Sequence, residues 1–156
     1  MEIIVADKTK LIEVLYIIRE CSQQLIEKGV KYWNNSIADY HEISDDIAHQ
    51  NVFLMVVNKV TVGTVTIKPN KKDPKTYYIS RLAIFPHFQK RGYASEILKF
   101  AENFAKDKGV KNLVGTTPVD DNALSQLLQE NGFTNQGIDS EIHEEFVRIK
   151  FEKQLT

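Results

Sequence analysis

The chain has 156 residues, 42% hydrophobic and 26% charged, with a formal net charge of −1, values that suit one globular domain over residues 1–156. This small charge excludes a global attraction to nucleic acid or to an anionic membrane surface, and the longest apolar run, residues 52–57, is too short to span a bilayer. The N-terminus lacks the basic segment of a signal peptide and the single cysteine, Cys21, excludes an internal disulfide, so we expect a cytoplasmic protein with a buried structural thiol.

The first half of the chain predicts a strand, two helices and a pair of strands. Apolar residues at helical spacing predict helices over 8–28 and 36–49, and Gly29 is a typical residue to end the first of them. The predicted strands cover residues 2–6, 52–58 and 61–68. Asn58 and Lys59 form a tight hairpin connection between the last two strands.

The second half alternates strands with helices. The predicted strands cover residues 76–85 and 112–117, a segment that begins at Phe133, and residues 145–152. The predicted helices cover residues 91–108 and 121–131, and Gly109 and Gly132 follow closely after them. Strands that alternate with helices favour an α/β layer structure, and the hairpins favour a mixed sheet.

The most informative segment connects the strand at 76–85 to the helix at 91–108. Pro86 ends the strand, and the residues Gln89-Lys90-Arg91-Gly92-Tyr93-Ala94 lead directly into the helix. The first turn of a helix leaves backbone N–H groups without internal partners and carries partial positive charge, so the segment predicts a phosphate or pyrophosphate site. Gly92 lets a ligand approach the backbone, and Lys90 and Arg91 add charge beside it.

This segment resembles the acyl-CoA-binding motif of the GNAT superfamily of N-acetyltransferases, which reads Gln/Arg-x-x-Gly-x-Gly/Ala after a strand. Gln89, Gly92 and Ala94 match the motif position by position. The predicted order of elements, β-αα-βββ-α-β-α-ββ, is similar to that of the complete GNAT fold. The resemblance therefore implies an α/β fold with a mixed, mostly antiparallel sheet flanked by helices, over nearly the whole chain.

The resemblance also implies acetyl-CoA as the co-substrate. In the family, the CoA pyrophosphate binds the backbone amides of this loop, and the pantetheine arm pairs with the strand before it. The residues implied to bind it here are Leu82, Ala83 and Ile84 on the strand, Gln89, Lys90, Arg91, Gly92, Tyr93, Ala94 and Ser95 in the loop, and Asn122 farther along the chain. A backbone N–H of residues 82–84 would stabilise the oxyanion, as in the family.

A later family motif, roughly Asn-x-x-Ala-x-x-Leu-Tyr-x-x-x-Gly-Phe, is matched only in part by residues 121–133. Leu127 matches the family leucine, but Leu128 stands where the family has a tyrosine that commonly protonates the departing CoA thiolate. Because a thiol has a pKa of about 8.5, the missing acid weakens the mechanism without excluding the reaction.

Three hydroxyl side chains are the catalytic candidates. Ser125, one turn before the leucine at the family's tyrosine position, would bind the sulfur or order a water. Some relatives carry a strand glutamate at the position of Tyr78. Strict alternation places Tyr78 and Ser80 on one sheet face with Leu82 and Ile84. The alternatives are packing on a sheet face for both hydroxyls and a water-mediated base in place of a side chain.

The family builds its acceptor pocket from the first two helices, their connection and the last hairpin. That connection holds Trp33, the only tryptophan, close to acidic residues, a combination that suits a cationic amine; a core position between the helices is the alternative. The four histidines show no metal-ligand spacing, so we expect no metal. The basic stretch 68–75 indicates a solvated turn and no nucleic-acid contact.

Together these observations predict an acetyl-CoA-dependent N-acetyltransferase. It would move an acetyl group to a primary amine of a small molecule or peptide by direct transfer in a ternary complex. The main alternative is an acyl-CoA-binding sensor or interaction module that has lost catalysis, and a generic nucleotide-binding α/β domain is a further one. We expect no nucleic-acid or membrane partner, and an exposed strand edge near the C-terminus would allow a homodimer.

Overall fold

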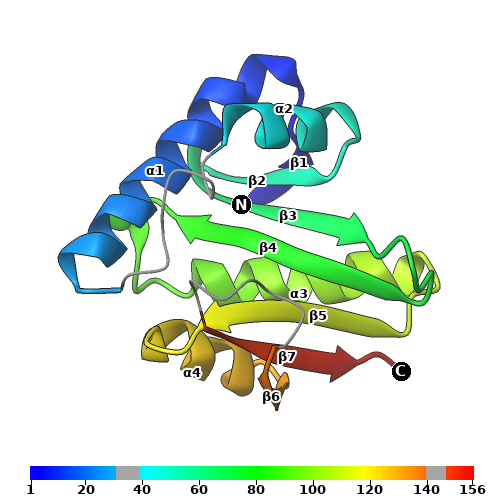
Figure 1. Cartoon of the computed structure of the whole chain (residues 1–156). Helices are drawn as coiled ribbons and strands as arrows, with labels where there is room; N and C mark the ends of the chain where they lie inside the picture. Colours follow the sequence, from blue (N-terminus) through cyan, green and yellow to red (C-terminus); the bar gives the residue numbers. More distant parts are fainter. Residues whose placement is uncertain (31–38, 140–146) are drawn as a thin grey trace. The chain divides into compact units, whose positions relative to one another are not determined.

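The computed structural model describes residues 1–30, 39–139 and 147–156, and the chain divides into two compact units. Unit 1 contains Met1–Ile67 and Arg81–Ile97, and unit 2 contains Lys68–Ser80 and Leu98–Thr156. Within the described residues, seven hydrogen-bonded strands follow the order β1-β2-β3-β4-β5-β7-β6 (Figure 1). The order of helices and strands along the chain is the predicted β-αα-βββ-α-β-α-ββ, apart from two short 3-10 turns.

In unit 1, three strands pair as antiparallel neighbours: β1 (Glu2–Val5), β2 (Val52–Val57) and β3 (Val60–Pro69). Asn58 and Lys59 join β2 to β3 with φ values of 49° and 67°. Two consecutive left-handed residues are what a two-residue type I′ turn requires, and this turn matches the twist of the strands it joins. The tight hairpin predicted from the sequence is therefore confirmed.

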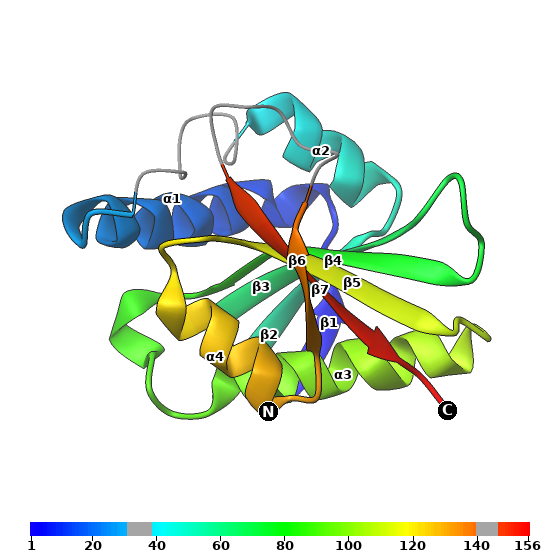
Figure 2. The ribbon, with the colours of Figure 1, turned by 60° about the horizontal axis from the view of Figure 1, so that its bottom comes forward.

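The helices of unit 1 are α1 (Leu11–Glu27) and α2 (Tyr40–Ala48), which lie along one face of its strands (Figure 2). The first predicted helix begins with a 3-10 turn, Lys8–Lys10, because the Asp7 carboxylate accepts from the backbone N–H of Thr9 and caps that turn. The second predicted helix starts later than expected, at Tyr40, and residues 36–38 lie outside the described part of the chain. The buried core of this unit includes Ile18, Ile43, Leu54, Met55, Val62 and Val65.

In unit 2, β5 (Asn112–Pro118) pairs in parallel with the first part of β4, a strand that runs over Thr76–Ile84. The pairing extends from Thr76 opposite Asn112 to Ile79 opposite Gly115. Strand β7 (Arg148–Gln154) pairs antiparallel with β5, and β6 (Thr134–Ile138) pairs antiparallel with β7. The predicted mixed, mostly antiparallel sheet is thus confirmed.

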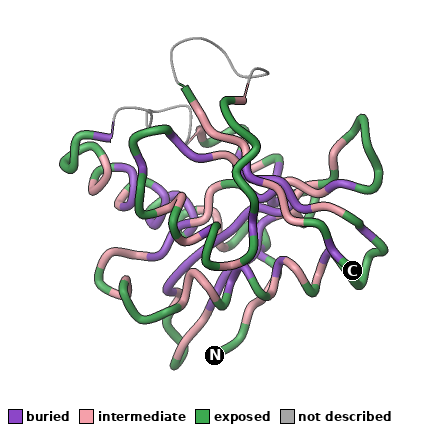
Figure 3. Tube along the Cα trace, turned by 90° about the horizontal axis from the view of Figure 1, so that it is seen from below, coloured by how far each residue is buried: buried purple, intermediate pink, exposed green. Residues whose placement is uncertain are grey.

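Helices α3 (Tyr93–Asp107) and α4 (Asn122–Glu130) lie on one face of the strands of unit 2 (Figure 2). The Asp121 carboxylate begins α4 by accepting from the backbone N–H of Leu124 at 3.1 Å. Buried residues are frequent along the strands (Figure 3). The buried core of unit 2 includes Ala101, Ala105, Leu113, Leu128 and Phe151.

Candidate functional site

Strand β4 is irregular at Arg81, directly before the residues predicted to bind pantetheine. Arg81 has a φ of 50°, a left-handed conformation that residues other than glycine rarely adopt. Such a residue inside a strand changes the direction in which the following side chains point. The strict alternation that the sequence suggested for Tyr78, Ser80 and Leu82 is therefore interrupted at Arg81.

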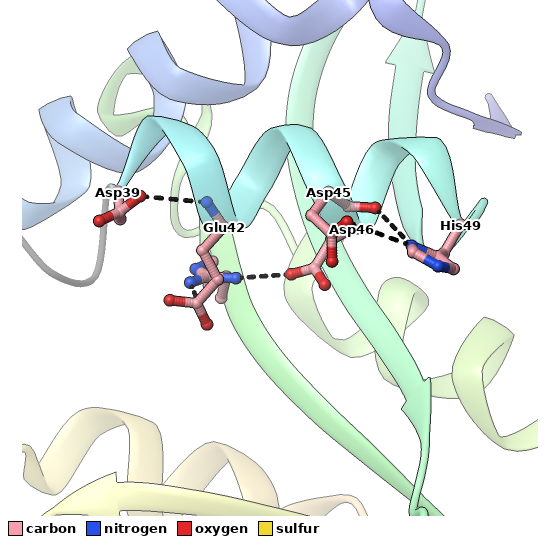
Figure 4. Close-up of polar contacts among 6 residues, drawn as sticks. Asp39, Glu42, Asp45, Asp46 and His49 are labelled. Carbon is pink, nitrogen blue, oxygen red and sulfur yellow. Dashed lines mark hydrogen bonds and ion pairs between the residues drawn. The ribbon is translucent and has the colours of Figure 1, made fainter.

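Glu42 and Asp46 project from the same helix, α2 (Figure 4), and both bind the guanidinium of Arg81. Nη1 of Arg81 lies 2.9 Å from Oδ2 of Asp46, and Nη2 lies 3.0 Å from Oε1 of Glu42. The side chains of Arg81 and Asp46 are 9% and 2% exposed, whereas that of Glu42 is 57% exposed. One buried acid and one surface acid therefore hold the same cation, at the point where β4 adopts its left-handed residue.

The carbonyl oxygen of Ile84, at the end of β4, accepts hydrogen bonds from two side chains. Sγ of Cys21 donates to it at 3.0 Å, and Nε2 of Gln89 donates to it at 2.9 Å. A carbonyl oxygen has two lone pairs, and both are used by these donors. The carbonyl oxygen of Ile84, a residue predicted to pair with pantetheine, is therefore already bonded within the protein.

Cys21 is a structural thiol, as predicted. Its side chain packs with Ile17 and Ala83 in a small buried cluster, with Phe85 against it. Burial, reinforced by the charge of Glu20, raises the pKa of the Cys21 thiol from 9.0 to about 12. The group is protonated at neutral pH and is not a nucleophile.

The loop after β4 contains two left-handed residues directly before a helix begins. A 3-10 turn, Pro86–Phe88, is followed by Lys90 with a φ of 64° and Gly92 with a φ of 83°, and α3 begins at Tyr93. Left-handed residues of this kind turn successive N–H groups toward one side, and the first turn of the helix adds more donors. A Cβ atom on Gly92 would meet nothing within 4 Å, so the loop is open to solvent at this residue.

Two residues of this loop, Lys90 and Arg91, are exposed cations. The guanidinium carbon of Arg91 lies 5.4 Å from the ring centre of Phe88, within range of a cation–π contact. The ring of Phe88 lies 6.3 Å from that of Phe85, which stacks at 5.5 Å on Tyr16 of α1. These ring contacts connect the loop to α1.

The three catalytic candidates have hydroxyl groups with different surroundings, all within unit 2. The hydroxyl of Tyr78 accepts a hydrogen bond from Nδ2 of Asn70 at 3.1 Å. Oγ of Ser125 lies 3.1 Å from Oγ of Thr117 on β5, and Ser80 is exposed. Their roles in catalysis stay predictions.

Helix α4 presents an apolar side chain at the position where the sequence departs from the family motif. Leu128 is 5% exposed and belongs to the core of unit 2. Asn122, predicted to bind CoA, is the exposed first residue of α4. Trp33, the predicted acceptor-binding residue, lies outside the described residues.

Over residues 1–30, 39–139 and 147–156, no group of three or more His, Cys, Asp or Glu side chains is placed to hold a metal ion. In the same part of the chain, no helix combines the length and the apolar character needed to cross a membrane.

A model of the acetyltransferase (GNAT) family matches residues 14–133, more than half of the chain. This chain belongs to the GNAT family of acetyltransferases. A sequence search of curated proteins finds no match. The family predicted from the loop motif is therefore confirmed, and with it the predicted assignment as an acetyltransferase.

Solved GNAT structures share the fold at low sequence identity. The PaiA N-acetyltransferase of Thermoplasma acidophilum, solved in complex with coenzyme A, is 15% identical over 98% of this chain and 98% of its own, with a TM-score of 0.80. A GNAT acetyltransferase of Streptococcus agalactiae is 15% identical over 99% and 95% of the two chains, with a TM-score of 0.85. YncA of Salmonella typhimurium, solved with acetyl-CoA, is 18% identical over 100% and 94%, with a TM-score of 0.78. These likenesses confirm the predicted GNAT fold.

Sequence reasoning missed three residues whose side chains form bonds at β4 or at the loop after it: Gln24, Asp46 and Arg81. Asp46 carried a signal, because it lies between Ile43 and Ile47 on the buried face of α2, and a buried acid needs a cation. Gln24 carried none, because its partner Gln89 is 65 residues away.

Proposed function

We propose that this GNAT chain transfers the acetyl group of acetyl-CoA to a primary amine of a small molecule or peptide, by direct transfer in a ternary complex. The observation that carries the proposal is the loop at residues 89–95, where Lys90 and Gly92 are left-handed, α3 begins, and the space beside Gly92 is open. The neighbours solved with coenzyme A and with acetyl-CoA support acetyl-CoA as the donor.

Residues of the loop and of β4 would bind the pyrophosphate and the pantetheine arm of acetyl-CoA. The backbone N–H groups of the loop, with Lys90 and Arg91 beside them, offset the charge of a pyrophosphate. Backbone groups of Leu82 and Ala83 and the N–H of Ile84 would align the pantetheine arm. Because α1 and β3 hold the end of β4 in place, these groups are oriented before the ligand arrives.

The reaction then needs an amine in its neutral form, since an ammonium has no lone pair. The amine nitrogen attacks the thioester carbonyl carbon, an N–C bond forms, the C–S bond breaks, and the proton of the amine passes to water. Leu128 has no proton to give, so CoA leaves as a thiolate. A leaving group with a pKa of about 8.5 tolerates this, at the cost of the roughly 10²–10⁴-fold that a general acid supplies.

The second candidate function is an acyl-CoA-binding module without catalysis. The observation that favours it is Leu128, which is buried in the core of unit 2. At this position the family has a tyrosine that donates a proton to the departing CoA thiolate. This candidate shares the donor site with the acetyltransferase and differs from it only in turnover.

A thiol-release assay distinguishes the two. Purified protein and acetyl-CoA are incubated with a panel of small amines, amino acids and short peptides, and free CoA thiol is measured. We expect release that depends on both protein and amine and that is lost in Gly92→Glu. Binding of acetyl-CoA without release across the whole panel would establish the binding module instead.

We further propose that both units work as one domain, because the family match at residues 14–133 includes parts of each. The lone cysteine is a buried thiol in the described structure, which supports the proposed location in a reducing cytoplasm.

A further inference from the structure

Helix α1 is joined to the predicted pyrophosphate loop by a pair of glutamine side chains. Nε2 of Gln24 donates to Oε1 of Gln89 at 3.0 Å, and Nε2 of Gln89 donates to Oε1 of Gln24 at 2.9 Å. The second hydrogen of Nε2 of Gln89 goes to the carbonyl oxygen of Ile84 at 2.9 Å. Both hydrogens and the oxygen of the Gln89 amide are therefore bonded within the protein, although Gln89 is the first residue of the CoA-binding motif.

The carbonyl of Ile84 determines which way the Gln89 amide points. A carbonyl oxygen accepts and does not donate, so Gln89 must turn its nitrogen toward Ile84 and its oxygen toward Gln24. Gln24 supplies the N–H that this oxygen requires. If Gln89 turned over, two carbonyl oxygens would face each other, and the bond that ties the start of the loop to the end of β4 would be lost.

Two residues one turn apart on α1 act on the same point of the chain. Cys21 donates to the carbonyl of Ile84, and Gln24, three residues later on the same helical face, holds the other donor to that carbonyl in place. Gln24 is partly buried, so its hydrogen bonds compete less with water than those of an exposed glutamine. The loop therefore leaves β4 at a fixed point and in a fixed direction.

We propose that Gln24 is a positioning residue for the acyl-donor loop. Through Gln89 it sets where the loop begins, and so aligns the backbone N–H groups near Lys90 and Gly92 that would receive the pyrophosphate. This inference rests on the proposed function and extends it, since α1 carries no part of the CoA-binding motif. Gln24 would touch no atom of the ligand.

The test compares two glutamines that are neighbours on α1. Gln24→Leu removes both hydrogen bonds to Gln89 with little change in size. Gln23→Leu is the matched control, because the amide of Gln23 is exposed and bonds Glu27 on the surface. We expect the dissociation constant for CoA, measured by calorimetric titration of the folded proteins, to rise about fivefold to tenfold in Gln24→Leu, the usual effect of a lost hydrogen bond. We expect no change in Gln23→Leu.

A double-mutant cycle shows whether Gln24 acts through Gln89. If it does, adding Gln24→Leu to Gln89→Leu weakens CoA binding no further. Hydrogen exchange of the loop amides without ligand should be faster in Gln24→Leu than in Gln23→Leu. A loss of stability alone would change neither the affinity of the folded protein nor this local exchange.

The outcomes separate the inference from the proposed function. Binding of CoA by Gln24→Leu with wild-type affinity, or a loss that is equal in the presence and absence of Gln89, would overturn the positioning role and leave the donor site standing. A wild-type protein that binds no CoA would overturn the proposed function and this inference with it.

Discussion

Asp46→Asn tests whether the buried ion pair between Asp46 and Arg81 stabilises the chain more than the surface pair between Glu42 and Arg81 does. Asp46 and Glu42 bind the same guanidinium at almost equal distances, 2.9 and 3.0 Å, but their side chains are 2% and 57% exposed. Removing one partner of a buried pair typically costs about 3–5 kcal/mol, because a charge is left without compensation. Because Glu42 remains in Asp46→Asn, we expect a cost near the lower limit, about 3 kcal/mol.

Glu42→Gln is the matched control on the same helix and the same cation. A pair with one exposed partner contributes about 0–1 kcal/mol, so this change should cost less than about 1 kcal/mol. Urea unfolding at pH 7 gives both values, provided that the m-values agree with that of the wild type. For a chain of this length, the loss in Asp46→Asn corresponds to a fall of about 6–12 °C in Tm. Equal costs for the two changes, or a cost under about 1 kcal/mol for Asp46→Asn, would refute the argument from burial.

Three further predictions concern other parts of the fold. A Cβ at Gly63 would lie 2.6 Å from a side-chain carbon and 3.0 Å from a backbone oxygen, whereas the nearest atom at Gly115 is 3.6 Å away. In urea unfolding, Gly63→Ala should therefore cost about 1–3 kcal/mol and Gly115→Ala less than about 1 kcal/mol, and equal costs would contradict the packing argument. Because the folded pKa of Cys21 is raised, to about 12, its contribution to stability is complete below pH 9 and is lost as the pH rises from there. The unfolding free energy of wild type should fall relative to that of Cys21→Val by about 1.4 kcal/mol per pH unit above 9. The same pH dependence for the two proteins would show that the Cys21 thiol does not titrate in this way. The hydrogen bond from Lys153 lowers the pKa of the Glu102 carboxyl group. The stability that the Lys153–Glu102 pair provides is therefore present above the ordinary carboxyl pKa and is lost as the pH falls below it. The destabilisation of Lys153→Met should therefore be about 1 kcal/mol at pH 7 and shrink toward pH 3, and a constant difference would argue against the pair.

The elements and the loop could be predicted because their signals are local in the sequence. Helical spacing gave α1, α3 and α4 to within a few residues, and the pair Asn58-Lys59 gave the β2–β3 hairpin. Gly92 could be recognised because glycine is the residue that adopts a φ of 83° at little cost, and a helix begins one residue later. Each of these features depends on neighbours along the chain.

The features that were missed depend on contacts between distant residues or on a conformation that the residue type does not favour. Arginine gives no sign of a left-handed φ, so the break in alternation at Arg81 could not be predicted from the sequence. The Gln24–Gln89 pair and the bond from Cys21 to Ile84 join residues 65 and 63 positions apart. The carbonyl of Ile84 is bonded to Cys21 and Gln89 within the protein. Pantetheine would therefore pair with other backbone groups of β4.

Calorimetric titration of three proteins with acetyl-CoA shows whether the loop at residues 89–95 binds this ligand, as proposed. Gly92→Glu places a carboxylate where the pyrophosphate would bind. Gly109→Glu is the control, because Gly109 also has a positive φ, 75° against 83°, and also has open space at its Cβ position, but it lies at the other end of α3. We predict that wild type and Gly109→Glu bind acetyl-CoA alike and that Gly92→Glu does not. Binding by Gly92→Glu with wild-type affinity, or no binding by folded wild type at millimolar acetyl-CoA, would show that this loop is not the binding site.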